Sequence, residues 1–145
     1  MADVFTHVLV AIDGSPAASE ALRRAAALAG SVSAHLTLLH VAMLAGLSSF
    51  DRPRAYVRAQ RVAHIEGERL LEDARTLAGG TPTATELHSG DPAEVICRRA
   101  AELGVDLVVV GSRKLGGIDR LLLGSVSSAV MRCAPCSVLV VRAPD

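Results

Sequence analysis

The feature that most constrains this chain is a set of short, nearly continuous aliphatic runs that lie far apart in the sequence. They are His7–Ile12, Val105–Val110 and Ser137–Val141. Runs of this length, rich in valine, are typical of strands buried on both faces of a parallel sheet. Parallel neighbours need long crossover connections, and longer helical patterns separate these runs. A chain of 145 residues is long enough for one such domain.

Two weaker segments complete a set of five predicted strands. Ala34–Val41 continues the aliphatic pattern, whereas Thr81–His88 has few large apolar residues and is typical of an edge strand. Helical patterns alternate with the strands, and such crossovers are right-handed. The predicted fold class is therefore α/β: a single domain over residues 1–145, with a doubly wound, five-stranded parallel sheet flanked by four helices.

Capping residues indicate where the helices begin and end. Ser15 and Pro16 begin the first helix, and we expect Gly30 to end it. Asp91 caps the third helix, and Glu94 completes a capping box. The second helix has an apolar stripe at helical spacing, which we expect to face inward: Ala63, Gly67, Leu70, Leu71, Ala74, Leu77 and Ala78.

Charge and hydropathy exclude several classes of function. The chain has 15 basic and 15 acidic residues and only three aromatic side chains of the Phe and Tyr types. We therefore expect no nucleic-acid partner, because phosphate neutralisation needs clustered positive charge and base stacking needs aromatic rings. No secretory leader and no uninterrupted apolar span are readable in the sequence. We expect no membrane association and a cytoplasmic location.

The three cysteines lack the spacing of a disulfide framework, which fits a reducing compartment better than a secreted scaffold. Cys133 and Cys136 have the spacing of a redox or zinc half-site. Reactive thiolates of that type usually lie at the start of a helix, whereas these cysteines follow one. We therefore interpret them as buried structural residues.

Polar residues follow the carboxyl ends of the predicted strands, where ligands bind in doubly wound sheets. Asp13 ends the first strand, and its carboxylate can accept hydrogen bonds from a ribose or an exocyclic amine. The same carboxylate could instead help to cap the helix that begins at Ser15. Val41 ends the second strand, where backbone groups could bond a base edge, and His40 beside it is expected to be solvated or capped.

The longest signal is the segment 111–127. Gly111 ends a buried strand, and Gly124–Ser125 opens a helix whose first N–H groups favour an anion. Ser127 adds a hydroxyl donor, while Arg113 and Lys114 add positive charge. Glycines between a strand and a helix are also ordinary turn residues. Neither the P-loop string nor Gly-x-Gly-x-x-Gly is present.

These motifs resemble the universal stress protein family along nearly the whole chain. The matching segments are Val8–Ser15, Leu38–Val41, Gly90–Pro92, Val108–Arg113, Leu121–Ser127 and Ala134–Val141. The resemblance implies an adenine nucleotide alpha hydrolase-like fold and a homodimer formed through the last strand, Ser137–Val141. It also implies a regulatory protein of the stress response that binds ATP, with Mg²⁺ as an accompanying ion.

The nucleotide-binding branch of that family carries Gly, two residues, Gly, nine residues, Gly and then Ser or Thr. Gly111, Gly124 and Ser125 fall on this pattern, and Lys114 replaces the second glycine. A lysine there either restricts the approach of the backbone to the phosphates or brings an ammonium group to them. We expect the lysine to bring its ammonium group to the phosphates, because Gly116 and Gly117 leave the loop adaptable.

The resemblance assigns a role to each matching position. Asp13 would hold the ribose or the adenine edge, and Val41 would bond the adenine through its backbone. Val110 and Gly111 would line the base and the sugar. The phosphates would lie against Gly124, Ser125, Val126 and Ser127. From the positive charge and glycines of the same loop, and not from the resemblance, we add Arg113, Lys114 and Gly116 to the candidate nucleotide-binding residues.

Two classes of function stay open. One is an ATP-binding regulatory dimer, and the other is a dimeric interaction protein that binds no nucleotide, with Lys114 marking a lapsed site. No nucleophile–base pair or cluster of metal ligands stands out, so we do not expect an enzyme, although the sequence does not decide slow ATP hydrolysis. Met43–Phe50 leaves the second strand at the ligand end, either packed on the core or as a cover over a bound base.

Overall fold

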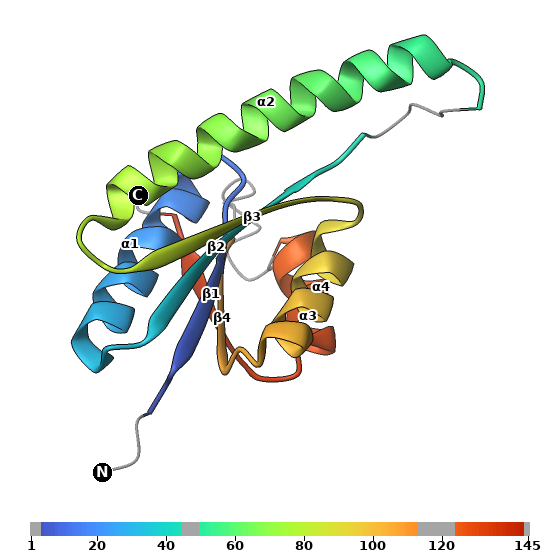
Figure 1. Ribbon diagram of the computed structural model, residues 1–145. Coiled ribbons are helices and arrows are strands. Elements are labelled where there is room, and N and C mark those ends of the chain that lie inside the picture. Colours follow the sequence, from blue (N-terminus) through green and yellow to red (C-terminus); the bar gives the residue numbers. More distant parts are fainter. Residues whose placement is uncertain (1–3, 45–49, 113–123, 144–145) are drawn as a thin grey trace.

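The computed structural model describes residues 4–44, 50–112 and 124–143, and it confirms the predicted fold class (Figure 1). All paired strands are parallel, in the order β3-β2-β1-β4-β5. The elements within the described residues are β1 (His7–Ala11), α1 (Pro16–Val32), β2 (His35–Ala42), α2 (Pro53–Ala78), β3 (Thr83–Ser89), α3 (Pro92–Leu103), β4 (Leu107–Ser112), α4 (Ser125–Cys133) and β5 (Ser137–Arg142).

The helices cover both faces of the sheet, α1 and α2 on one side and α3 and α4 on the other (Figure 1). Alternate residues of β1 point to opposite faces because a strand has a period of two. Val8 and Val10 therefore join the core under α1 and α2, whereas Leu9 joins the core with Ile96 and Val130. The aliphatic runs of the sequence form the sheet that both helical layers share.

Two details predicted on the side of α1 and α2 are wrong. Helix α1 continues through Gly30 to Val32, and its C-cap is Ser33, whose φ of 56° is left-handed. The Ser33 N–H bonds the Ala29 carbonyl, so a serine takes the place expected of a glycine. Leu77 is 42% exposed, because the buried line of α2 consists of Gly67, Leu71, Ala74 and Ala78.

Strand β3 is an edge strand, as predicted, and one ion pair holds it to α3. Arg99 Nε lies 2.7 Å from Glu86 Oε1, and Arg99 Nη2 lies 2.9 Å from Glu86 Oε2. This two-pronged geometry is the stronger form of an arginine–carboxylate contact. The hydrogen bonds from Arg99 hold the pKa of Glu86 below its ordinary value.

A polar cluster closes the amino end of the sheet between β1 and β4. The Asp106 carboxylate accepts hydrogen bonds from the Thr6 N–H at 2.9 Å, the Thr6 hydroxyl at 3.1 Å and the His7 N–H at 3.0 Å. Burial raises the pKa of Asp106, but these hydrogen bonds outweigh it and leave the pKa below its ordinary value.

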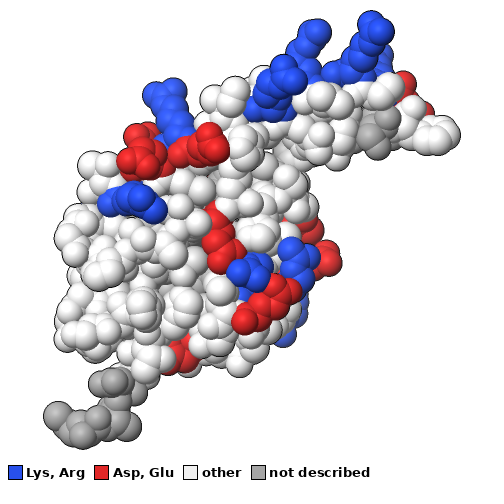
Figure 2. All heavy atoms as spheres, viewed as in Figure 1, with Lys and Arg blue, Asp and Glu red and all other residues white. Residues whose placement is uncertain are grey.

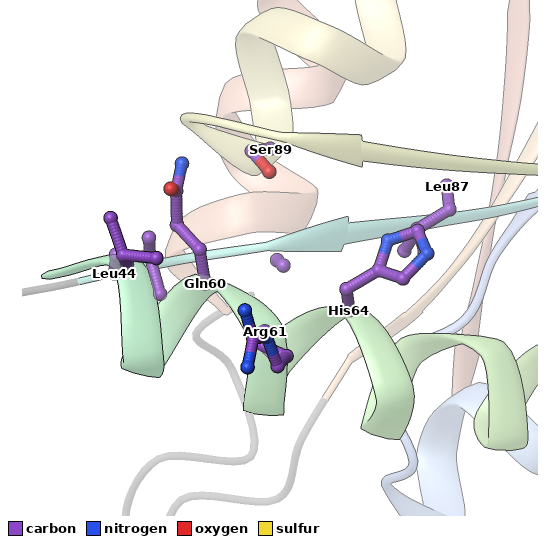
Figure 3. Close-up of a pocket in the computed structure, with 9 residues that line it drawn as sticks. Leu44, Gln60, Arg61, His64, Leu87 and Ser89 are labelled. Atoms are coloured by element: carbon purple, nitrogen blue, oxygen red, sulfur yellow. The ribbon is translucent and has the colours of Figure 1, made fainter.

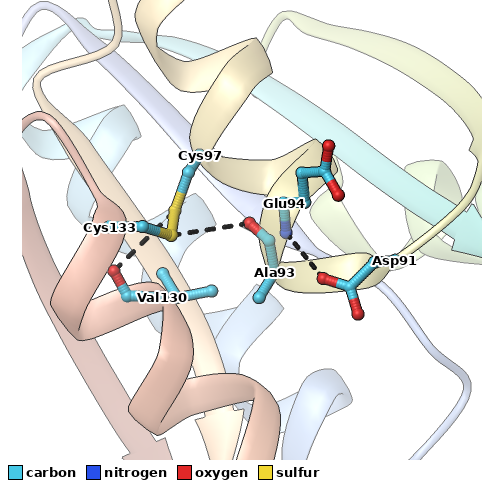
Figure 4. The surroundings of a disulfide bond; sticks show 6 residues. All are labelled: Asp91, Ala93, Glu94, Cys97, Val130 and Cys133. Atoms are coloured by element: carbon cyan, nitrogen blue, oxygen red, sulfur yellow. Dashed lines mark hydrogen bonds between the residues drawn. A yellow bond between two sulfur atoms is a disulfide. The ribbon is translucent and has the colours of Figure 1, made fainter.

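A disulfide joins Cys97 of α3 to Cys133 of α4, with the two Cα atoms 5.9 Å apart (Figure 4). The expectation that Cys133 is buried is wrong. Cys133 is exposed, and its partner lies 36 residues away in sequence. Cys136 is a free, half-buried thiol. The sequence spacing pointed to Cys133 and Cys136, whereas packing of the two helices decided the pair.

Charged groups of both signs are scattered over the face seen in Figure 2, and several Lys or Arg side chains lie along α2 at its upper edge. No field of a single sign covers this face.

Across the described ranges, no helix combines the length and the hydrophobicity needed to span a bilayer.

Candidate functional site

A cavity of about 210 Å³ opens at the carboxyl end of the sheet, between β1 and β4. Strand order reverses between these two strands, and such a switch point is where ligands bind in open α/β sheets. Five of the predicted site residues lie together in its wall: Asp13, Val41, Val110, Gly111 and Val126. The remaining wall residues are Ala11, Ile12, Ala18, Leu39, Met43 and Pro92.

Asp13 lies exposed at the rim of the cavity, at the turn from β1 into α1. Its Oδ1 accepts a hydrogen bond from the Ser15 N–H at 2.9 Å, and Ser15 Oγ in turn accepts from the Ala18 N–H at 3.1 Å. Ser15 is therefore the residue that caps α1, and the Asp13 carboxylate supports the turn that holds Ser15 in place. The same turn places the carboxylate at the cavity.

The backbone of Val41 faces the space beside the end of β1. The pairing of β1 with β2 ends at Ala11 and Leu39, and the Ile12 N–H then donates to the Leu39 carbonyl at 2.8 Å. In a parallel strand, the peptide groups of alternate residues point to the same side. The N–H and C=O of Val41 therefore point toward β1, beyond the place where that strand has ended.

His40 has a structural role, in agreement with the expectation that it is capped. Its Nδ1 donates to the Ile12 carbonyl at 2.6 Å. Gly67 of α2 packs over it, and a Cβ at Gly67 would lie 2.9 Å from His40 Cδ2 and 2.6 Å from Leu87 Cδ1. The imidazole thus secures the end of β1 under α2.

Gly111 is needed for packing, a reason that the sequence did not reveal. A Cβ at this position would lie 2.5 Å from the Ala17 carbonyl carbon and 2.7 Å from the Ala17 oxygen. Real Cβ atoms do not approach a backbone so closely. The glycine therefore lets the first turn of α1 rest on β4, which brings Ala18 to the cavity.

The start of α4 borders the same cavity, and Ser112 supports it. The Gly124 N–H donates to Ser112 Oγ at 3.2 Å, and Ser112 is 4% exposed. Sequence reasoning assigned no role to Ser112, although a small polar residue at the end of a buried strand is a usable signal. Ser127 donates its hydroxyl to the Gly124 carbonyl at 3.0 Å and is 1% exposed, so this hydroxyl stabilises the first turn.

Helix α4 begins without a side-chain cap. The first N–H groups of a helix have no partner within it, so they are available to an anion or to water. Ser125 and Val126 are exposed at this end. Arg113, Lys114 and Gly116 lie outside the described residues, as does segment 45–49 of the predicted cover, whereas Met43 lines the cavity.

A larger groove of about 410 Å³ lies under the amino-terminal half of α2, beside the ends of β2 and β3 (Figure 3). Its wall contains Gln60, Arg61 and His64 of α2 and Leu87 and Ser89 of β3. His64 Nε2 lies 2.9 Å from Glu68 Oε1. Although this groove is larger, it lies away from the switch point, so the cavity between β1 and β4 is the better candidate.

Fold and cavity together define a doubly wound α/β domain with its candidate site at the topological switch point. The model of the universal stress protein family matches residues 5–142. The chain is 38% identical over 148 residues to universal stress protein YxiE of Bacillus subtilis, covering 96% of this chain and 100% of that protein. The chain belongs to the universal stress protein family.

Solved structures agree with this assignment. A universal stress protein from Lactobacillus plantarum superposes with a TM-score of 0.83 at 26% identity, covering 94% of this chain and 97% of that chain. A universal stress protein in complex with cAMP matches with a TM-score of 0.65 at 27% identity, covering 97% of this chain and 98% of that chain. At least one relative of this fold therefore binds an adenine nucleotide.

Proposed function

We propose that this protein is a regulatory dimer that binds an adenine nucleotide, ATP with Mg²⁺, in the cavity between β1 and β4. The observation that carries the proposal is that three groups suited to a nucleotide lie around the same cavity. An acidic side chain at Asp13, inward-facing peptide groups at Val41 and the uncapped start of α4 border one cavity. The relative in complex with cAMP adds support for the adenine class.

The base and the ribose would occupy the enclosed part of the site. The cavity of about 210 Å³ is smaller than the roughly 300–1,000 Å³ of whole-ligand pockets, so it would enclose only part of a nucleotide. Aliphatic walls at Leu39 and Val110 suit a flat base. The N–H and C=O of Val41 offer it a donor and an acceptor, and the Asp13 carboxylate would accept from ribose hydroxyls.

The phosphates would lie outside the cavity, at the first turn of α4. The first N–H groups of this helix, which no side chain caps, and the positive end of the helix dipole favour an anion there. Gly124 has no side chain to obstruct the approach, and Ser125 is exposed. Asp13 is the one carboxylate in the described wall of the cavity. Mg²⁺ would therefore be held chiefly by the phosphates and water, as it commonly is in phosphate sites.

The dimer would form through β5. In the described sheet, β5 is an edge strand that pairs with β4, and its apolar Leu139 is 39% exposed. An exposed edge with apolar side chains is a surface that proteins usually cover. Sedimentation velocity tests this assembly. The native chain should sediment as a dimer, and Leu139→Arg should sediment as a monomer.

Calorimetric titration with ATP and Mg²⁺ tests the site. The native protein should release binding heat, Asp13→Ala should weaken binding, and Asp73→Ala, an exposed carboxylate on α2, should not. If Lys114→Gly binds ATP more weakly than the native protein, the ammonium group of Lys114 contacts the phosphates. Binding recovered only in Lys114→Gly would show that the lysine closes the site. No heat in any variant would favour the interaction protein without nucleotide.

A further inference from the structure

The disulfide between Cys97 and Cys133 joins the two helices that flank the candidate site. Cys97 lies in the middle of α3, and Cys133 is the last residue of α4. The first residue of α3, Pro92, and the second residue of α4, Val126, both line the cavity between β1 and β4. The cross-link therefore bridges two elements whose amino ends both contribute to the cavity wall.

The surroundings of the two sulfur atoms suit the reduced state as well as the oxidised one. Cys97 Sγ lies 3.9 Å from the Val130 carbonyl oxygen, and Cys133 Sγ lies 3.7 Å from the Ala93 carbonyl oxygen (Figure 4). Each carbonyl belongs to the helix opposite its cysteine. When the sulfurs are thiols, each S–H has an acceptor across the helix contact. Reduction therefore leaves neither thiol without a hydrogen-bonding partner.

The two sulfurs differ in access. Cys97 is 9% exposed, whereas Cys133 is an exposed residue. A reagent in solution reaches Cys133 first, and Cys97 lies within bonding reach of the sulfur that has been modified. An exposed cysteine with a second cysteine beside it is the arrangement of a reversible thiol–disulfide couple.

We propose that Cys97 and Cys133 form a reversible oxidation site, at which a low-molecular-weight disulfide such as glutathione disulfide converts two thiols into the cross-link between α3 and α4. The Cys133 thiolate attacks one sulfur of that disulfide and expels a thiolate, which gives a mixed disulfide on Cys133. The Cys97 thiolate then attacks Cys133 Sγ and expels the second thiolate. Two cysteine thiols are oxidised, one reagent disulfide is reduced, and the two cysteine protons pass to the expelled thiolates.

Cys136 is not part of this couple, although its spacing from Cys133 pointed to it. It is half-buried and lies at the entry of β5, where burial raises its pKa. A raised pKa leaves less thiolate at neutral pH, and the thiolate is the attacking species. Cys136 therefore serves as an internal reference thiol in the same chain.

Thiol counting on the full chain tests the site without any nucleotide. After equilibration of the reduced protein with glutathione disulfide, alkylation and peptide mass spectrometry should find Cys136 labelled and Cys97 linked to Cys133. Dithiothreitol should restore three labelled cysteines. A link between Cys133 and Cys136, or three labelled thiols after oxidation, would overturn the proposal.

Single variants test the order of attack. Cys97→Ser should accumulate the glutathione mixed disulfide on Cys133, because the resolving thiol is gone. Cys133→Ser should leave the buried Cys97 unmodified, and Cys136→Ser should form the cross-link as the native chain does. A glutathione adduct on Cys97 in Cys133→Ser would contradict the assignment of Cys133 as the entry point.

A second consequence rests on the proposed nucleotide site. A cross-link that restrains α3 against α4 should preorganise the cavity wall, so the oxidised chain should bind ATP at least about threefold more tightly than the reduced chain. Equal affinities with complete disulfide formation would remove this coupling and leave the oxidation site. No ATP binding in either state would contradict the proposed function, while the thiol counts would still decide the oxidation site.

Discussion

Asp106 lies next to a strand at the amino end of the parallel sheet, Asp13 follows a strand at the carboxyl end, and the two residues are used differently. At the amino end, Asp106 accepts hydrogen bonds from Thr6 and His7, which lie 100 and 99 residues away in sequence. At the carboxyl end, Asp13 accepts a local bond from the Ser15 N–H and lies at the cavity rim.

The difference shows how this fold separates stability from binding. Long-range hydrogen bonds accepted by Asp106 tie β4 to the start of β1, so the strands are held in register at the end away from the cavity. At the other end the chain turns away from β1 at Asp13, and the backbone of Val41 is left facing that space. Substitution of the aspartate at the amino end should therefore change stability, and substitution of the aspartate at the carboxyl end should change binding.

The largest effect is expected at Gly111, where packing leaves no room for a side chain. Gly111→Ala should lower the free energy of unfolding by about 3 kcal/mol, because a buried backbone does not yield to an added methyl group. Urea denaturation measures the change. Gly80→Ala is the matched control, since a Cβ there meets nothing within 4 Å. Equal midpoints for the two variants would contradict the close approach of α1 to β4.

Asp106→Ala should lower the free energy of unfolding by about 1.5 kcal/mol, because it removes three hydrogen bonds that join β1 to β4. The affinity for ATP should not change. Asp51→Ala, an exposed aspartate before α2, controls for loss of surface charge. Weaker ATP binding in Asp106→Ala at full folding would contradict the separation of the two ends.

Asp13→Ala should give the opposite pattern. We expect its dissociation constant for ATP to rise about tenfold, which corresponds to about 1.4 kcal/mol. Its free energy of unfolding should change by less than about 1 kcal/mol, because the carboxylate is exposed and its bond to the Ser15 N–H is local. Calorimetric titration and urea denaturation of the same sample measure both quantities. If Asp13 had only a structural role, the free energy of unfolding would fall and the dissociation constant for ATP would stay unchanged.

The smallest effect is a dependence of stability on pH at the amino end. Burial, followed by the nearby charge of His35, lowers the pKa of His7 below its ordinary value of 6.5. Below pH 6.5 the unfolded chain therefore binds the proton more readily than the folded chain, so stability falls as pH falls from 7 to 5. His7→Gln should flatten this slope in urea denaturation series.

Local chemistry allowed most of the fold to be predicted. Three kinds of prediction depend only on residues near one another in sequence: the valine-rich strands, the caps at Ser15 and Asp91, and the weak third strand. The structure confirms each of them. The end of α1 was predicted two residues early, at Gly30. A serine can take the left-handed cap when packing holds it there, and packing is not readable from propensity.

The candidate site was predictable in part for the same reason. Strand ends are visible in the sequence, so Asp13, Val41, Val110 and Gly111 could be placed at one edge of the sheet before their positions were known. Pro92 was missed because its role depends on where α3 packs. Ser112 was missed as well, although its place at the end of a buried strand is a usable signal.

By itself, the sequence determined the order of elements, the strand ends and the caps, since each follows from short-range periodicity and side-chain chemistry. Only the tertiary structure decided the partner of Cys133, because a separation of 36 residues carries no signal of contact. It also showed that the backbone of Ala17 leaves no room for a side chain at position 111. In addition, it showed that the Ser127 hydroxyl donates a hydrogen bond to the Gly124 carbonyl. Those facts depend on how two helices pack against the sheet, and that packing is set by the whole chain at once.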